Sequence, residues 1–238
     1  MKLSVLVSAR RDSKYLAKFL FAYFAHTDRA WDTEILVMLN QRDTWNVELI
    51  DHFAGMVQFF KEDYNQGRAG LHNYYNELAK HATGDWIVYF CEDHLITLHN
   101  WNRYILDEVE FLGLDPGQVW CLVPTLVNEG PLHKVNHVLS RGYYSALGCI
   151  SRSAWLDSYI NDITERIPSE RTIVLPLPMI YDFSADDPSP MAEAAAQSVL
   201  NPDFTEGSDG FIGFADPRTR QAVEADALEL NQRIKESS

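Results

Sequence analysis

The stretch "GDWIVYFCEDHLI", from Gly84 to Ile96, joins an apolar run to three consecutive polar residues. A short apolar run that begins after a turn-forming Gly-Asp pair predicts a buried β-strand. Glu92, Asp93 and His94 stand where that strand ends. Carboxylates at such a position are costly unless water solvates them or a cation binds them. The stretch therefore predicts either the start of a solvated loop or a site for Mn²⁺ or Mg²⁺, which carboxylate oxygens and an imidazole can ligate.

Strand-like and helix-like patterns alternate before this stretch. Such alternation predicts an α/β fold, in which a mostly parallel sheet carries helices on both faces. Ligands of these sheets bind beyond the carboxyl ends of the strands, which is where the three polar residues lie. The predicted strands are Lys2–Ser8, Glu34–Asn40, Val57–Asp63 and Gly84–Phe90, and the predicted helices are Lys14–His26, Val47–Met56 and Leu71–Ala82.

The composition changes near residue 180. We predict one main domain over residues 1–180 and a C-terminal extension over residues 181–238, which is partly irregular because it is rich in Pro, Asp and Ala and ends in a helix. Within the main domain, we predict a helix over Asn100–Leu112 and a strand over Gln118–Val127. The segment that follows is expected to be strand-like at first and helical from Ser151.

Charge and cysteine content exclude several classes of partner. The formal net charge of −14 argues against nucleic-acid binding and against an anionic membrane surface. The three cysteines are far apart and odd in number, which indicates free thiols in a cytoplasmic protein. No apolar run reaches the roughly 18 residues of a membrane span, and the N-terminal run before Arg10 is expected to be a strand and not a signal peptide.

Five motifs in order resemble the GT-A glycosyltransferases, in particular the family 2-like bacterial transferases that build polysaccharides and lipopolysaccharides. The first is "SVLVSARRDSKYL" at the first strand, and the second is "EILVMLNQR" at the second. An Asn-x-Gly loop follows at Asn65, and then a helix that carries Asn76 and leads into Gly84 at the family's spacing. The fifth, "YFCEDHL", is similar to the family's D-x-D motif. The resemblance covers the chain to about Leu98 and, more weakly, to Trp155.

This resemblance implies a GT-A (Rossmann-like) fold and an enzyme that moves a sugar from a UDP- or GDP-sugar to a carbohydrate, lipid or protein acceptor with the help of Mn²⁺ or Mg²⁺. The acceptor would lie over Leu139–Trp155. Asp93 and His94 would hold the metal. Matching the motifs position by position gives the nucleotide-binding residues, which are Ser8, Ala9, Arg11, Asn40, Gly67, Arg68, Glu92 and Asp93.

The chain departs from the family pattern at four places. Ser8 and Arg11 replace the proline and asparagine of the first loop, and Leu39 stands where an acidic residue is expected. Three extra residues lie between the Asn-x-Gly loop and the helix asparagine. His94 replaces the final metal-binding aspartate, which leaves open a metal-independent enzyme or an inactive relative.

An inverting transfer needs a general base that deprotonates the acceptor hydroxyl. Each of the four carboxylates in the right part of the chain could also be a helix surface charge. Asp157 and Asp182 are the catalytic candidates we retain, and Asp162 and Glu165 are the other two.

Other polar and aromatic groups offer further sites. His133 and His137 are spaced i, i+4, which suits a metal on a helix and equally suits two surface histidines. Arg10, Arg11 and Arg68 are cations that could meet a diphosphate. The aromatic residues that could form either a sugar platform or the core are Trp101, Tyr143, Tyr144 and Trp155.

Two other classes of function stay open. A non-catalytic nucleotide-sugar-binding or scaffold protein could keep the fold and lose the chemistry. Both this protein and a glycosyltransferase could form a homodimer. A nucleotidyltransferase shares the strand–helix alternation, but the first loop here lacks the Gly-rich, Lys-containing pattern of those enzymes. The GxSxG, P-loop and GxGxxG motifs are absent from the sequence, which disfavours esterases, P-loop NTPases and dinucleotide enzymes.

Overall fold

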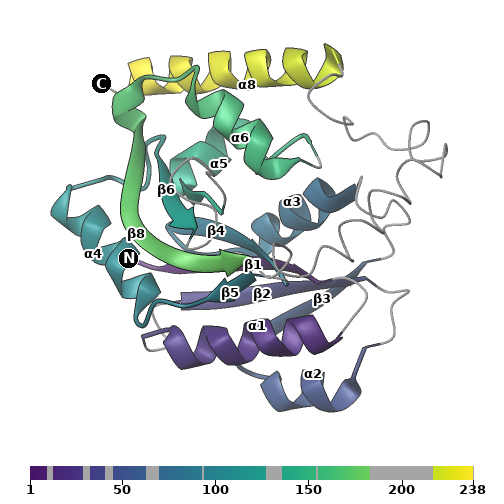
Figure 1. Ribbon diagram of the computed structural model, residues 1–238. Coiled ribbons are helices and arrows are strands. Elements are labelled where there is room, and N and C mark those ends of the chain that lie inside the picture. Colours follow the sequence, from purple (N-terminus) through teal and green to yellow (C-terminus); the bar gives the residue numbers. More distant parts are fainter. Residues whose placement is uncertain are drawn as a thin grey trace.

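Eight strands of the described chain form one sheet in the order β3-β2-β1-β4-β7-β6-β8-β5 (Figure 1). The computed structural model describes residues 1–9, 13–28, 33–40, 45–62, 70–92, 94–126, 136–153, 155–182 and 217–237. The strands are β1 (Leu3–Ala9), β2 (Thr33–Asn40), β3 (Gln58–Glu62), β4 (Trp86–Cys91), β5 (His94–Ile96), β6 (Cys121–Leu126), β7 (Val138–Ser140) and β8 (Thr172–Asp182). The helices are α1 (Ser13–His26), α2 (Val47–Phe53), α3 (Leu71–His81), α4 (Trp101–Phe111), α5 (Arg141–Leu147), α6 (Leu156–Thr164), the short η3 (Ser169–Arg171) and α8 (Pro217–Glu236).

The sheet is mixed, with a parallel N-terminal half. β1 pairs in parallel with both β2 and β4, and β3 extends this group beside β2. β7 runs antiparallel between β4 and β6, while β8 is parallel to β6 and antiparallel to β5. Four of these seven pairings are parallel, which confirms the predicted α/β sheet.

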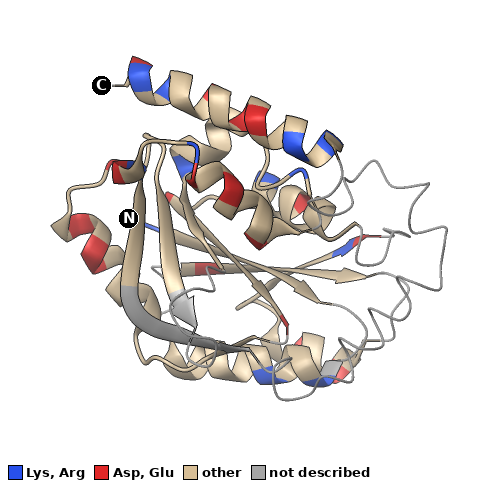
Figure 2. Ribbon diagram, turned by 45° about the horizontal axis from the view of Figure 1, so that its top comes forward, with Lys and Arg blue, Asp and Glu red and all other residues tan. Residues whose placement is uncertain are grey.

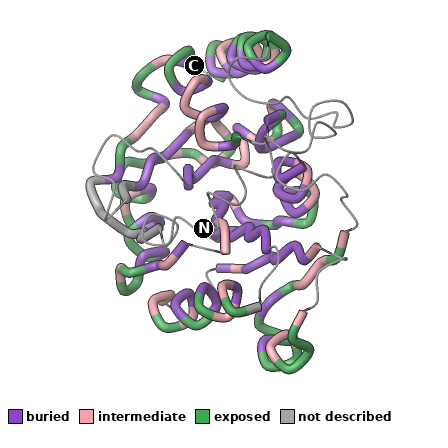
Figure 3. The backbone as a smooth tube through the Cα atoms, turned by 45° about the vertical axis from the view of Figure 1, so that its right-hand side comes forward, coloured by how far each residue is buried: buried purple, intermediate pink, exposed green. Residues whose placement is uncertain are grey.

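Helices cover both faces of the sheet, as predicted (Figure 1). Leu3, Val5 and Val7 of β1 pack in one hydrophobic core with α1, α2 and α4. Leu6 points to the other face and packs in a second core with α3, α5, α6 and α8. Side chains alternate across a strand, so a strand buried on both faces appears in the sequence as a continuous apolar run. Figure 3 shows the central strands as almost uniformly buried.

The segment before α6 corrects one prediction. We expected strand-like structure up to Ser151, but β7 ends at Ser140 and α5 follows directly. The Ser140 hydroxyl accepts a hydrogen bond from the main-chain N–H of Tyr143, which caps the new helix. Gly148 ends the helix with a φ of 67°. These two caps mark the ends of a helix that the β-rich composition of the segment did not predict.

The amino ends of β1, β2 and β4 are joined by one largely buried carboxylate, that of Glu34 on β2. It accepts hydrogen bonds from Lys2 Nζ at 2.8 Å, Ser4 Oγ at 2.5 Å, and the main-chain N–H groups of Thr83 at 2.6 Å and Gly84 at 3.1 Å. A Cβ atom at Gly84 would lie 2.6 Å from the nitrogen of Ser4, so only glycine fits this close approach. Glu34 therefore fixes three strands relative to one another.

The Glu34 cluster predicts a pH-dependent contribution to stability. Burial alone would raise the pKa of Glu34, but hydrogen bonds from Lys2, Ser4 and Thr83 outweigh burial and lower the pKa below its usual value. A lowered folded-state pKa gives stability that is present above the unfolded-state pKa and is lost as the pH falls through the folded-state pKa.

We expect Glu34→Gln to lower the free energy of unfolding at pH 7 by about 2 kcal/mol, because the donors lose a charged acceptor. The difference from wild type should shrink between about pH 5 and pH 3 in urea titrations. Glu77→Gln, which removes a carboxylate paired with Lys80 on the surface of α3, is the matched control and should have a small effect. A constant difference across this pH range would contradict the prediction.

The C-terminal helix α8 packs on α5 and α6, and a line of charged residues follows its outer side (Figure 2). Asp226 lies on its inner side, buried, where it accepts hydrogen bonds from Arg152 Nε at 3.0 Å and from the Tyr159 hydroxyl at 2.5 Å. Burial and the neighbouring carboxylate raise the pKa of Tyr159. Among the described helices, none is long and apolar enough to span a bilayer.

We expect Asp226→Ala to lower the free energy of unfolding by about 2 kcal/mol, because it leaves Arg152 and Tyr159 without their partner at the helix interface. Glu229→Ala, on the exposed side of the same helix, is the control and should change stability by less than about 0.5 kcal/mol. Urea denaturation of both variants makes the comparison. Equal losses would show that α8 is not anchored through Asp226.

Candidate active site

The carboxyl ends of β1, β2 and β4 meet at one edge of the sheet (Figure 1). Ser8, near the end of β1, is in register with Met38 of β2 and with Cys91 of β4. Of the residues predicted to bind the nucleotide, the structure describes four at this edge: Ser8, Ala9, Asn40 and Glu92. The other four lie outside the described residues: Arg11, Gly67, Arg68 and Asp93.

A buried tyrosine of α3, Tyr75, joins the ends of β1 and β4. Its hydroxyl lies 3.0 Å from Ser8 Oγ and donates to the main-chain oxygen of Phe90 at 2.8 Å. It also lies 3.4 Å from the sulfur of Cys91. Burial raises the pKa of Tyr75 well above its usual value, so the phenol keeps its proton. Ser8 and Ala9 are themselves buried, so their side chains are enclosed at the end of β1.

His94 begins the short strand β5, which sequence patterns did not predict. β5 pairs with β8, so that the main chain of His94 lies opposite that of Asp182. The His94 side chain is only 8% exposed. Its Nδ1 accepts a hydrogen bond from the main-chain N–H of Cys91 at 3.3 Å and lies 2.9 Å from the side-chain nitrogen of Asn136. The residue is thus part of the hydrogen-bonded structure of the edge.

Asn136 connects His94 to the rest of the site. It is buried and has a φ of 54°, a left-handed conformation that asparagine adopts more readily than most residues. Its Nδ2 donates to the main-chain oxygen of Tyr89 at 2.7 Å as well as facing His94. Its main-chain N–H donates to Asp157 Oδ1 at 3.1 Å. One residue therefore contacts β4, β5 and the start of α6.

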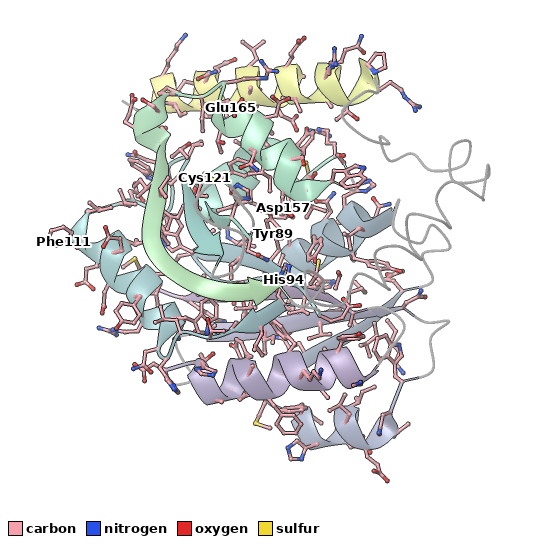
Figure 4. The ribbon with its side chains drawn as sticks, viewed as in Figure 1. Tyr89, His94, Phe111, Cys121, Asp157 and Glu165 are labelled. Carbon is pink, nitrogen blue, oxygen red and sulfur yellow. The ribbon has the colours of Figure 1, made fainter. Side chains whose placement is uncertain are left out.

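Asp157 is the predicted catalytic candidate that the structure places beside this network. It stands in the first turn of α6, and its side chain is 39% exposed. Its Oδ1 accepts from the Tyr89 hydroxyl at 2.7 Å as well as from Asn136. Burial and the charge of Asp157 raise the pKa of Tyr89, which keeps this phenol a donor. Figure 4 shows Asp157, Tyr89 and His94 grouped in the same region of the molecule.

His137 extends the same hydrogen-bonded network from Tyr89 to Asn161 of α6. Its ring is fully buried, with Nδ1 2.8 Å from the Tyr89 hydroxyl and Nε2 2.9 Å from the side-chain oxygen of Asn161. His137 Nδ1 and Asp157 Oδ1 thus both contact the Tyr89 hydroxyl, which donates its proton to Asp157. The predicted metal pair of His133 and His137 stays untested as a pair, since His133 lies outside the described residues.

Asn76 of α3, the asparagine of the family's helix, holds the predicted acceptor segment. Its Oδ1 accepts from the main-chain N–H groups of Ile150 at 2.8 Å and Ser151 at 3.2 Å, and its Nδ2 donates to the main-chain oxygen of Ser151 at 2.8 Å. These three bonds attach the chain between α5 and α6 to the half of the protein that carries the strand ends.

The other three base candidates either lie away from Asn136 or have side chains outside the described part of the chain. Asp162 forms an ion pair with Arg166 within α6. Glu165 ends that helix, and Figure 4 shows it well away from His94. The main chain of Asp182 lies beside His94 in the sheet, while its side chain is outside the described part. Among the described base candidates, Asp157 alone is hydrogen bonded to the Asn136 network.

The proposed aromatic platform divides between core and surface. Trp101 and Tyr143 are buried in the two hydrophobic cores, so they take the core role that we left open for them. Tyr144 is half-buried beneath the guanidinium of Arg141. Trp155 is 45% exposed, just before α6 and Asp157, and stays a candidate for sugar stacking.

The described residues do not by themselves form a site for a divalent metal. Within the described ranges, no three His, Cys, Asp or Glu side chains gather closely enough to hold an ion. Asp93, the other predicted ligand, lies outside those ranges. The Nδ1 atom of His94 is occupied by N–H donors, which does not fit a ligand to a metal at that nitrogen.

Comparison with solved structures identifies the fold. TarS of S. aureus (residues 1–349) matches over 96% of this chain and 71% of its own, with a TM-score of 0.58 and 16% identity. A second structure of S. aureus TarS matches over 43% of its own chain, and TarS 1–349 has also been solved with UDP-GlcNAc and with UDP. The mannosyltransferase PcManGT from Pyrobaculum calidifontis, in complex with GDP-Man and Mn²⁺, matches over 98% of this chain and 73% of its own, with a TM-score of 0.60 and 14% identity.

These likenesses show that the chain has a GT-A-type glycosyltransferase fold, as its motifs predicted. No protein-family model and no curated protein sequence matches it. At 14–16% identity the solved structures establish the fold alone.

Three site residues were missed by sequence reasoning. Tyr75 and Tyr89 sit within apolar patterns that predict core positions, and they are indeed buried. Only their hydroxyl groups, which reach polar partners far away in the chain, give them a role at the site. Asn136 lies in a segment without a regular pattern, and the one available signal was its neighbour His137.

Proposed function

We propose that this protein transfers a sugar from a nucleotide-diphosphate donor to an acceptor hydroxyl, at the carboxyl edge of β1, β2 and β4. The observation that carries the proposal is the chain of hydrogen bonds from His94 through Asn136 to Asp157. It joins the family's D-x-D position to a partly exposed carboxylate at the start of a helix, in a fold of the glycosyltransferase type. The structural neighbours support the donor class, since they were solved with UDP-GlcNAc, UDP or GDP-Man.

Asp157 is the general base in this proposal. Its Oδ1 is held by Tyr89 and Asn136, while none of the described residues is hydrogen bonded to its Oδ2. The acceptor hydroxyl would give its proton to Asp157 as its oxygen bonds to the anomeric carbon of the sugar. The bond from that carbon to the diphosphate breaks in the same step, and the nucleoside diphosphate leaves. Such a single displacement inverts the anomeric carbon.

Of the predicted features of the site, the divalent metal has the least support from the described residues. PcManGT was solved with Mn²⁺, and Asp93 stays the predicted ligand here. When bound, a divalent ion would neutralise the departing diphosphate. The His94 ring does not fit as a partner to Asp93 through Nδ1. Assignments to the cytoplasm and to a homodimer stay predictions, and no disulfide joins the cysteines in the described part of the chain.

Calorimetric titration with UDP, GDP, ADP and CDP tests the donor class. We expect UDP or GDP to bind, and the corresponding nucleotide sugars to be hydrolysed slowly when no acceptor is present. Binding of UDP or GDP without any hydrolysis or transfer would favour the alternative, a nucleotide-sugar-binding or scaffold protein. The absence of binding to all four, with Mn²⁺ present, would contradict both.

Asp157→Asn tests the general base. We expect turnover of the nucleotide sugar to fall by about 10²- to 10⁴-fold, while UDP or GDP affinity changes by less than about threefold. Asp162→Asn, on the same helix and paired with Arg166, is the matched control and should keep wild-type turnover. Equal turnover in the two variants would remove Asp157 from the mechanism.

A further inference from the structure

The Nδ1 atom of His94 faces two N–H groups. The main-chain N–H of Cys91 lies at 3.3 Å, and a main-chain N–H can only donate. The side-chain nitrogen of Asn136 lies at 2.9 Å. An imidazole nitrogen that receives hydrogen bonds must offer its lone pair, so it carries no proton.

The orientation of the Asn136 amide is fixed by a third group. Its nitrogen also lies 2.7 Å from the main-chain oxygen of Tyr89, and a carbonyl oxygen can only accept. Turning the amide over would place two oxygens against each other at that distance. The observed orientation is kept even though Asn136 Oδ1 is buried without a hydrogen-bond partner among the described residues, which is a costly state. The nitrogen of Asn136 therefore faces His94.

From these contacts we infer that His94 carries its proton on Nε2, and that this N–H donates a hydrogen bond to the diphosphate of the bound nucleotide. The inference rests on the proposed function for the identity of the ligand. The tautomer follows from the contacts alone, because a neutral imidazole with an unprotonated Nδ1 must carry its hydrogen on Nε2. An N–H group on Nε2 is compatible with the structure, because within the described part of the chain this atom is not a buried polar atom left without a hydrogen-bond partner.

This role differs from that of the aspartate that His94 replaces in the family pattern. An aspartate offers lone pairs to a metal, and the metal then meets the phosphate oxygens. Here both nitrogens are unsuited to a metal: Nδ1 is occupied by donors, and Nε2 has no free lone pair. A histidine N–H can instead contact a phosphate oxygen directly, in a charge-assisted hydrogen bond.

Asn136 is the positioning residue for this donor. Its amide nitrogen fixes the His94 tautomer, while its main-chain N–H holds Asp157. The replacement Asn136→Gly separates the two roles. Glycine accepts the left-handed φ of 54° and keeps the main-chain N–H, so only the amide is lost.

Nitrogen NMR of the histidine rings tests the tautomer without any ligand. In ¹⁵N-histidine-labelled protein, we expect His94 to show a pyridine-type Nδ1 and a pyrrole-type Nε2, assigned as the pair of signals missing from His94→Gln. Asn136→Gly should raise the share of the opposite tautomer. A protonated Nδ1 in the wild type would overturn the inference, whether or not the protein binds nucleotides.

A matched pair of variants tests the donor role. Asparagine at position 94 can place an oxygen near the Nδ1 position and has nothing at Nε2, whereas glutamine can place an amide N–H near the Nε2 position. In calorimetry with UDP or GDP in EDTA, we expect His94→Asn to weaken binding by about tenfold, and His94→Gln by less than about threefold. Asn136→Gly should weaken binding in the wild type and have no further effect in the His94→Asn background.

Titrations with Mn²⁺ distinguish a His94 that donates a hydrogen bond to the diphosphate from a His94 that ligates the metal. Any gain in nucleotide affinity that Mn²⁺ gives to the wild type should be the same in His94→Asn, because His94 would not be a ligand. A gain that His94→Asn abolishes would overturn the inference, as would equal affinities of wild type and His94→Asn in EDTA. If neither UDP nor GDP binds, the proposed donor class and the diphosphate contact both fail, and the NMR result alone decides the tautomer.

Discussion

The parallel pairing of β1 with both β2 and β4 is the constraint on which the rest of the structure depends. Because the three strands run in the same direction, their amino ends gather at one edge of the sheet and their carboxyl ends at the other. Glu34 joins the amino ends through charged and main-chain hydrogen bonds. Tyr75 joins two of the carboxyl ends, and Ser8, one of the predicted nucleotide-binding residues, lies 3.0 Å from its hydroxyl.

Asn136 joins the strand ends to the second half of the chain, as Glu34 and Tyr75 join the strand ends to one another. Its left-handed backbone lets the side chain face β4 and His94 while the main-chain N–H faces Asp157. Asn76 makes a second connection of this kind, to the segment between α5 and α6. The residues proposed to meet the donor and those proposed to meet the acceptor are thereby held by a few hydrogen bonds, an arrangement that a displacement between two bound molecules would need.

The replacement of an aspartate by His94 changes the chemistry available to the site. A carboxylate in this position attracts a cation, whereas an Nε2–H group attracts the phosphate oxygens themselves. In a chain with a net charge of −14, neutral donors of this kind let an anion approach without a metal between them. The hydrogen bonds to Nδ1 make this difference a property of the fold and not of the histidine alone.

The sequence by itself determined the alternation of strands and helices, the parallel sheet and the resemblance to GT-A enzymes, and it offered Asp157 and Asp182 as base candidates without choosing between them. These follow from side-chain periodicity and from motifs a few residues long. The start of α5, the strand β5 and the burial of Trp101 were decided only by the tertiary structure. So were the roles of Tyr89 and Asn136 and the tautomer of His94, because hydrogen-bond partners that lie more than 40 residues away in the chain meet only after folding.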